Sequence, residues 1–246
     1  MKEIIGVTPN AKRRTPNPVH MTSAIIVAAG ASRRMGFDKL LVPLGGRPVV
    51  VHSVQRFETC DAISEIVLVV NALRRTEIEP LIRGCGFRKV TQIVTGGAER
   101  HLSVLEGLKQ LSPETRIVAV HDAARPLVTP AAIARAVAVA QEYGAVSLAA
   151  PVVDTLKRAD DSGAVSGNVE RAGLWAMQTP QVFRRDWLQA AYEMIIAGGN
   201  AVSDEVSAVQ AAGFPVRLLA NSDWNIKITY PRDLDLAEKL MHLEKV

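Results

Sequence analysis

Short runs of aliphatic and β-branched residues recur along the chain from Ser23 onwards, and longer segments with helical periodicity separate them. The longer segments place apolar residues three and four positions apart, as over 104–111, which predicts helices with one buried face. The short runs are bounded by turn residues and predict buried strands. They span residues 24–28, 66–70, 90–94, 117–120 and 146–150.

Strands that alternate with helices predict an α/β fold with a mostly parallel sheet covered by helices on both faces. Pro48 suits a first helical position, and Thr129 followed by Pro130 predicts an N-cap and the start of a helix. The other predicted elements are helices over 184–198 and 204–212, a strand over 226–228 and a closing helix from Pro231.

The alternation of strands and helices is interrupted after Pro151. A turn cluster over 160–163 is flanked by short alternating runs, which predicts an antiparallel, projecting β-arm at about 152–171. At the other end, residues 1–22 mix proline, asparagine and basic residues without apolar periodicity, which predicts a disordered leader. The chain is therefore predicted to form a leader and a single domain over 23–246 that carries the arm.

Composition and charge narrow the classes of function. The net charge is +4, but the basic residues lie singly and only 4% of residues are aromatic, so a nucleic-acid surface is not expected. No apolar run approaches the roughly 20 residues of a membrane helix, and no secretory signal opens the chain, so we expect a cytoplasmic protein without membrane association. Two cysteines form neither a disulfide framework nor a zinc pattern. Anionic small molecules are the expected partners.

A loop of small residues follows the first predicted strand and suits a phosphate. Ala28, Ala29 and Gly30 let backbone N–H groups approach phosphate oxygens, while Arg34 and Lys39 can add charge-assisted contacts. The spacing is neither Gly-x-Gly-x-x-Gly nor the P-loop pattern, which disfavours dinucleotide dehydrogenases and P-loop NTPases. For this loop alone, a tight turn with solvated basic residues is the alternative.

Two further loops follow strands at the edge where open α/β sheets bind ligands. One runs over 96–100, and Ser103 is expected to cap the helix after it. The other begins at His121-Asp122, and a carboxylate there can hold a magnesium ion that bridges substrate phosphates. A lone aspartate is usually a turn or cap residue, so the prediction depends on three loops converging at one edge. His121 is expected to be a structural hydrogen-bond partner.

Together with motifs further along, these loops resemble the 2-C-methyl-D-erythritol 4-phosphate cytidylyltransferase family of isoprenoid-precursor synthesis. The matching segments run in family order from about Ser23 to the end. They are Ala28-Ala29-Gly30 with Arg34-Met35, Gly96-Gly97 through Arg100 and Ser103, His121-Asp122-Ala123-Ala124-Arg125-Pro126, Asp154-Thr155-Leu156-Lys157, Leu174-Trp175, Thr179-Pro180-Gln181, Asp204-Glu205 and Asn225-Ile226-Lys227-Ile228-Thr229.

The resemblance implies a Rossmann-like nucleotidyltransferase fold, Mg²⁺ as cofactor, and a homodimer whose arms clasp the partner subunit. Arg34, Lys39 and Lys227 would surround the triphosphate of CTP and the reacting phosphorus, and Asp122 would bind magnesium or substrate. The resemblance implies that CTP contacts Ala28, Ala29, Gly30, Gly97, Arg100, Ser103 and Ala123, and that Thr155 and Arg171 reach the polyol phosphate, partly across the dimer.

Phosphoryl-type transfer needs positioning and charge neutralisation more than a protein nucleophile, so basic residues and Mg²⁺ can suffice. The expected reaction is direct attack by the acceptor phosphate on the α-phosphorus of CTP. The main alternative is a cytidylyltransferase for ribitol 5-phosphate or another pentitol phosphate, because its CTP-side motifs would look the same. A molybdopterin cytidylyltransferase and a non-catalytic nucleotide-binding protein on the same fold are the weaker alternatives.

Overall fold

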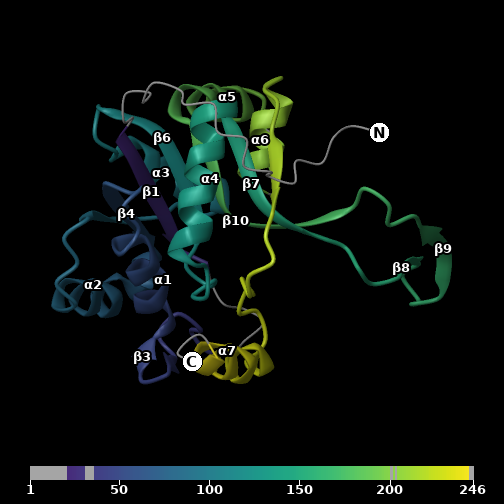
Figure 1. The fold of residues 1–246 in the computed structure, drawn as a ribbon, viewed down its shortest axis with the longest axis horizontal. Coiled ribbons are helices and arrows are strands. Elements are labelled where there is room, and N and C mark those ends of the chain that lie inside the picture. Colours follow the sequence, from purple (N-terminus) through teal and green to yellow (C-terminus); the bar gives the residue numbers. More distant parts are fainter. Residues whose placement is uncertain (1–20, 31–35, 200–201, 203, 244–246) are drawn as a thin grey trace, which may run out of the picture.

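The computed structural model describes residues 21–30, 36–199, 202 and 204–243, and a seven-stranded sheet forms its centre (Figure 1). The strands lie in the order β11-β7-β10-β6-β1-β4-β5. Within this sheet β10 runs antiparallel to β6 and β7, whereas the other neighbouring strands run parallel. Their bounds are β1 (Met21–Ala28), β4 (Glu65–Val70), β5 (Val90–Thr95), β6 (Thr115–Asp122), β7 (Ala145–Pro151), β10 (Trp175–Arg184) and β11 (Arg217–Ala220).

Helices cover both faces of the sheet, because successive side chains of a strand point to opposite faces. Ile25 of β1 belongs to a cluster on one face, whereas its neighbours Ala24 and Ile26 belong to the cluster on the other. The face of Ile25 is covered by α3 (Arg100–Lys109), α5 (Arg185–Ala197) and α6 (Glu205–Ala211). The other cluster is covered by α1 (Val49–Glu58), α2 (Arg75–Gly84), α4 (Pro130–Tyr143) and α7 (Pro231–Leu243).

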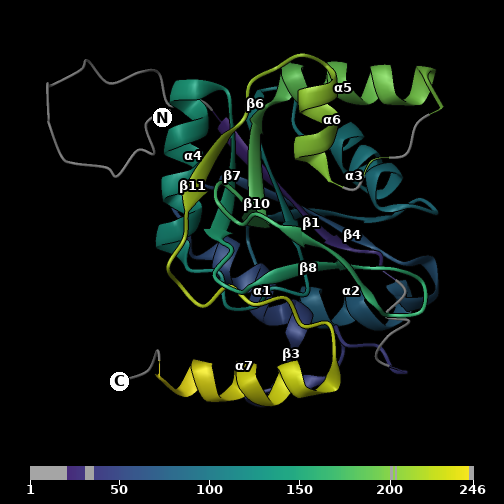
Figure 2. The ribbon, with the colours of Figure 1, turned by 90° about the vertical axis from the view of Figure 1, so that its right-hand side faces the viewer.

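The ends of the molecule carry different helices. Figure 2 shows α5 and α6 at one end and α7 at the opposite end. At that opposite end α7 packs against the short hairpin of β2 (Pro43–Leu44) and β3 (Arg47–Pro48). Elsewhere, the 3₁₀ helix η1 (Ala72–Arg74) leads into α2. Among the described residues, no helix has the length and apolar character that crossing a membrane requires.

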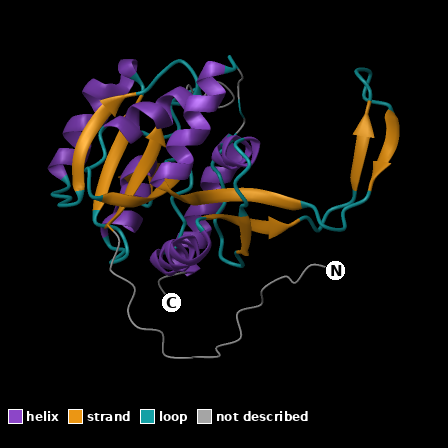
Figure 3. Ribbon diagram, turned by 90° about the horizontal axis from the view of Figure 1, so that it is seen from above, coloured by secondary structure: helices purple, strands orange, loops and turns teal. Residues whose placement is uncertain are grey.

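A two-stranded arm projects from the body, as Figures 1 and 3 show. It consists of β8 (Leu156–Ala159) and β9 (Val165–Val169), which pair antiparallel. The Asp160 carboxylate accepts hydrogen bonds from the backbone N–H groups of Ser162 and Ala164, and Gly163 supplies the positive φ of +85° that the turn needs. The antiparallel excursion predicted from the sequence is therefore present.

The α/β architecture predicted from the hydrophobic pattern is confirmed, with local corrections. Thr129 is the N-cap of α4, as expected, and accepts a hydrogen bond from the Ala132 N–H at 3.1 Å. Pro48 is not the first helical residue but the N-cap of α1. The first strand starts at Met21, inside the segment assigned to the leader, and residues 1–20 lie outside the described part of the chain.

The strand predicted over 226–228 is wrong, because this segment is irregular. Its Ile228 N–H donates to the Ala124 carbonyl at 2.8 Å instead of to a neighbouring strand. Two strands of the central sheet, β10 and β11, were not predicted, and neither was the short hairpin of β2 and β3. In β10 the pairing with β7 shifts register between Met177 and Gln181, next to Pro180, which lacks a ladder donor.

Candidate active site

Asp122 lies at the carboxyl end of β6 and is surrounded by positively charged side chains. Its Oδ1 accepts hydrogen bonds from Arg100 Nε at 3.2 Å and Nη2 at 3.1 Å, and its Oδ2 accepts one from Lys227 Nζ at 2.7 Å. Arg125 Nε stands 3.9 Å from the same Oδ2. The loops after two strands and the irregular segment that carries Lys227 therefore converge on one carboxylate.

The electrostatics of this cluster keep Asp122 ionised. Burial acts to raise the pKa of Asp122, because the side chain is only 12% exposed, but the charges of Arg100 and Lys227 outweigh it and hold the pKa well below its usual range. Burial acts in the opposite sense on Arg100, whose pKa is nevertheless raised by Glu205 and Asp122. At neutral pH Asp122 is therefore an ionised carboxylate held against the cationic guanidinium of Arg100.

The segment that carries Lys227 is fixed by hydrogen bonds instead of strand pairing. The Asn225 side chain donates to the Thr179 carbonyl at 2.8 Å, and Arg125 Nη1 donates to the Asn225 carbonyl at 2.7 Å. Lys39 Nζ donates to the carbonyl of Ile228 at 2.7 Å. Lys39 is thus placed beside the segment of Lys227, although the two lie far apart in the sequence.

The nucleotide loops expected from the sequence lie at the same edge. Ala29 and Gly30 follow β1, and the Asn71 side chain donates to the Ala29 carbonyl at 3.3 Å. Gly96 and Gly97 follow β5 where a side chain would not fit. A Cβ on Gly96 would lie 2.7 Å from the Cβ of Ala29, and one on Gly97 would lie 2.5 Å from the Cβ of Leu102. The two loops are therefore packed against each other, as close backbone approach requires.

Ser103 does not cap the helix as predicted. The N-cap of α3 is Glu99, and Ser103 lies inside the first turn, buried, with its hydroxyl donating to the carbonyl oxygens of Glu99 and Gly97. The prediction was wrong because α3 begins at Arg100, three residues before Ser103. Ala123, next to Asp122, is also buried, and its N–H donates to the Val27 carbonyl at 3.0 Å.

His121 is a structural residue, as expected. It is fully buried, its Nδ1 is 2.9 Å from Thr179 Oγ1 and its Nε2 is 3.1 Å from the Arg125 carbonyl. Burial lowers the pKa of His121 to about 3, so the imidazole is neutral at physiological pH. The Thr179 hydroxyl also accepts the Asp122 N–H, so this contact holds the end of β6 in place.

Thr155 and Arg171 are not part of this cluster. Both side chains are exposed in the arm region, and Arg171 donates to the Val153 carbonyl. Within one chain the arm extends away from the body (Figure 3). Arg34 lies outside the described residues, between Gly30 and Gly36.

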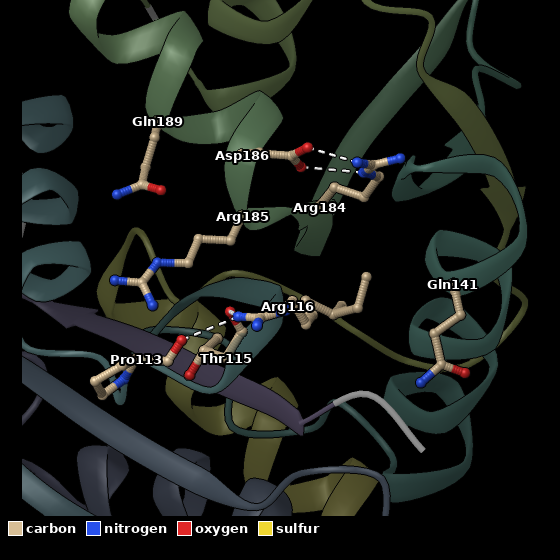
Figure 4. A pocket seen from close by; sticks show the side chains of 9 residues that line it. Pro113, Thr115, Arg116, Gln141, Arg184, Arg185, Asp186 and Gln189 are labelled. Atoms are coloured by element: carbon tan, nitrogen blue, oxygen red, sulfur yellow. Dashed lines mark hydrogen bonds and ion pairs between the residues drawn. The ribbon is translucent and has the colours of Figure 1, made fainter. Parts of the chain in front are cut away.

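A cleft of about 740 Å³ lies at the opposite end of β6 from Asp122, near Thr115 (Figure 4). It is lined by Arg116, Arg184 and Arg185, but these guanidinium groups have partners. Arg184 pairs with Asp186, while the other two donate to backbone carbonyl oxygens at 3.0 Å and 2.7 Å. The cleft does not receive the loops at the carboxyl ends of the strands, so it is not the candidate active site.

The donor set fits a magnesium ion only in combination with a substrate. Within the described residues, no group of three or more histidine, cysteine, aspartate or glutamate side chains could hold a metal. Mg²⁺ is commonly bound through one or two carboxylates together with substrate phosphates and water. Asp122, ionised and at the strand end, satisfies that requirement.

Comparison with known proteins identifies the class to which these features belong. Residues 22–243 match the family model of IspD, 2-C-methyl-D-erythritol 4-phosphate cytidylyltransferase. The chain belongs to this cytidylyltransferase family. The curated enzyme of Alkaliphilus oremlandii is 41% identical over 91% of this chain and 96% of its own length. That of Pelotomaculum thermopropionicum is 42% identical over 89% and 93%.

Solved structures of cytidylyltransferases share the fold. The 4-diphosphocytidyl-2C-methyl-D-erythritol synthase of Anaerococcus prevotii superposes with a TM-score of 0.79 at 28% identity, covering 91% of this chain and 99% of that one. The 2-C-methyl-D-erythritol 4-phosphate cytidylyltransferase of Thermus thermophilus gives 0.75 at 30% identity, covering 89% and 98%. The predicted nucleotidyltransferase fold and the predicted enzyme class are therefore confirmed.

Sequence reasoning assigned no role to two charged residues at the site of this cytidylyltransferase. Arg125 lies in the motif that follows β6, but its contact with Asp122 depends on a fold around 121–126 that the motif does not reveal. Glu205 begins α6, and its neighbours in the sequence indicate a solvent-exposed acid in a first helical turn. In the structure it is fully buried against Arg100.

Proposed function

We propose that this cytidylyltransferase transfers the cytidylyl group of CTP to 2-C-methyl-D-erythritol 4-phosphate, giving 4-diphosphocytidyl-2-C-methyl-D-erythritol and pyrophosphate. The observation that carries the proposal is the family match over residues 22–243. The cluster of Asp122, Arg100 and Lys227 at the carboxyl edge of the sheet supports it, because a polyanionic substrate needs cations at that edge.

The reaction needs little covalent chemistry from the protein. An oxygen of the acceptor phosphate forms a bond to the α-phosphorus of CTP while the bond to the β-phosphate oxygen breaks, and pyrophosphate carries away the electron pair. The second pKa of a phosphate monoester is about 6, so the attacking oxygen is ionised at neutral pH and no general base is required. The work of the site is to align the reactants and to neutralise charge.

The proposed roles follow the positions of the basic residues. Lys227, which donates to Asp122, Lys39, which donates to the Ile228 carbonyl, and Arg34 would neutralise the triphosphate and the charge that develops in the transition state. The proposed CTP contacts lie at the end of β1, in the loops after β1, β5 and β6, and in the first turn of α3: Ala28, Ala29, Gly30, Gly97, Arg100, Ser103 and Ala123. When bound, Mg²⁺ would add positive charge against the phosphates, and Asp122 is its proposed ligand.

The arm is proposed to complete the acceptor side of the site in a homodimer. Thr155 and Arg171 are exposed in the arm region, where a partner subunit could bring them to the polyol phosphate. Apolar side chains on the arm are also unusually exposed, Val153 by 74% and Val165 by 67%, which favours burial against a second protein surface. Sedimentation at micromolar concentration tests the dimer. A cytoplasmic location remains a prediction from the sequence.

The experiment that tests the function is pyrophosphate release by the purified protein with CTP and Mg²⁺. Methylerythritol 4-phosphate and ribitol 5-phosphate are compared as acceptors at equal concentration. We expect release with methylerythritol 4-phosphate alone. Release with ribitol 5-phosphate alone would keep the cytidylyl transfer and replace the acceptor, and release with neither would refute the proposal.

A further inference from the structure

A fully buried carboxylate, Glu205, stands directly behind the proposed site. It begins α6, and its Oε1 accepts hydrogen bonds from Arg100 Nη1 and from the Tyr192 hydroxyl, the latter at 3.0 Å. Its other oxygen, Oε2, is buried and has no hydrogen-bond partner among the described residues. A carboxylate is costly to bury, so a position that retains one next to an arginine invites a functional explanation.

The guanidinium of Arg100 is held between two carboxylates. Nε and Nη2 donate to Asp122 Oδ1, at the proposed site, and Nη1 donates to Glu205, on the protein side. Donors at both ends of a planar guanidinium fix its position and its plane. Without Glu205, the group would keep only Asp122, and Nη1 would lose the acceptor that holds the far side of its plane.

We propose that Glu205, anchored by Tyr192, is a positioning residue that sets the orientation of Arg100 against Asp122. It does not touch the substrate in this proposal. Its effect is transmitted through Arg100, whose place beside Asp122 determines how much of that carboxylate faces the reactants. The activity readout of the proposal rests on the proposed function, whereas its spectroscopic readout does not.

Three substitutions separate hydrogen bonding, charge and packing. Glu205→Gln keeps the volume and an oxygen for Arg100 and Tyr192, and its NH₂ group would occupy the place of the unpartnered Oε2. Glu205→Leu removes both acceptors at similar volume. Tyr192→Phe removes only the anchoring hydroxyl and keeps the buried ring. Glu193→Gln, at an exposed glutamate of the same helix as Tyr192, is the matched control.

The expected loss of kcat/KM differs among these variants. Removing a side chain that holds a metal ligand in place typically lowers activity by about 10- to 100-fold. We expect a loss of similar size on removing the side chain that holds Arg100. Glu205→Leu should lose roughly that amount, Tyr192→Phe and Glu205→Gln less, and Glu193→Gln nothing. Rates are expressed per folded enzyme, measured by near-ultraviolet circular dichroism, so that lost stability does not count as lost activity. Equal kcat/KM in all four variants would overturn the proposal.

Nuclear magnetic resonance of ¹⁵N-arginine-labelled protein supplies the second readout. The Nε–H of Arg100 donates to Asp122 and should exchange slowly with water, and Arg100→Lys assigns its resonance by removing it. Glu205→Leu should shift or broaden this resonance, and Tyr192→Phe should shift it less. An unchanged resonance would overturn the proposal even if activity fell. If Glu205→Leu does not fold, Glu205→Gln and Tyr192→Phe decide the same question.

Failure of the proposed function can be distinguished from failure of this inference. If the wild-type protein releases pyrophosphate with neither acceptor, the proposed function fails, while the Arg100 resonance still reports on the role of Glu205. If the wild-type protein is active and the resonance is insensitive to Glu205, only the positioning role fails.

Discussion

Replacing Lys227 by alanine should separate catalysis from stability. In the structure Lys227 Nζ lies 2.7 Å from Asp122 Oδ2, and its side chain is 39% exposed. The charge therefore lies at the strand edge where the triphosphate is proposed to bind, and it is open enough to solvent that its contribution to folding is small.

The expected loss of activity is much larger than the expected loss of stability, so the two can be told apart. An ion pair exposed to this degree contributes about 0–1 kcal/mol to stability, and Asp122 keeps Arg100 and Arg125 as neighbours after the substitution. A positioned donor that acts on transition-state charge is worth roughly 10²- to 10³-fold in kcat, or about 2.7–4 kcal/mol. We therefore expect a large loss of kcat with the free energy of unfolding nearly unchanged.

The assay is pyrophosphate release at saturating CTP and acceptor, paired with urea unfolding of the same preparations. Lys109→Ala is the matched control, because Lys109 Nζ also lies 2.7 Å from a carboxylate, that of Glu106, but its side chain is 54% exposed on α3. The control should retain wild-type kcat. A Lys227→Ala enzyme with near wild-type kcat, or one that loses activity only because it unfolds, would refute the catalytic role.

Three further outcomes are expected. Arg171→Ala should raise the KM for the acceptor with little change in the KM for CTP, and steady-state kinetics with each substrate varied would contradict this if CTP binding were lost instead. Gly107→Ala should destabilise by about 1–3 kcal/mol, because its Cβ would lie 2.7 Å from Ile25 Cγ2, whereas Gly84→Ala, with open space around it, should stabilise by about 0.5–1 kcal/mol in urea unfolding. Thr129→Ala removes the cap of α4 and should cost about 1 kcal/mol in the same measurement, while no loss would remove the capping assignment.

The hydrophobic pattern was sufficient for the central strands. β1 and β4 are buried on both faces, and their runs of isoleucine and valine have no other stable arrangement at that length. The pattern was misleading over 226–228, where two isoleucines alternate with a lysine although the segment pairs with no strand. Ile228 is buried by tertiary packing, so the alternation has a cause other than a sheet.

β10 could not be found because it contains Thr179 and Pro180, which locally indicate a turn. The strand tolerates the proline only where its pairing with β7 is interrupted. β11 is short and mostly exposed, so it gives little periodic signal. Both strands are defined by their neighbours in the sheet and not by their own sequence.

In the active site, too, some features follow from the local sequence and others only from neighbours in the fold. Convergence of strand ends predicted that the loops after three strands would meet at one edge, and the structure brings Arg100, which follows β5, to Asp122 at the end of β6. The contact of Lys227 with Asp122 was not predicted. Glu205 was beyond reach, because its burial depends on Arg100, 105 residues away, and on Tyr192, one helix earlier. A local pattern cannot reveal a charge that is buried by distant partners.

Oxygen labelling tests the central claim, that an oxygen of the acceptor phosphate forms the new bond to the α-phosphorus of CTP. Methylerythritol 4-phosphate labelled with ¹⁸O in its phosphate oxygens is incubated with CTP, Mg²⁺ and the enzyme, and the products are examined by ³¹P nuclear magnetic resonance. We predict ¹⁸O in the oxygen that bridges the two phosphorus atoms of the cytidine product, and none in the released pyrophosphate. Labelled pyrophosphate, or an unlabelled bridge, would contradict the proposed mechanism.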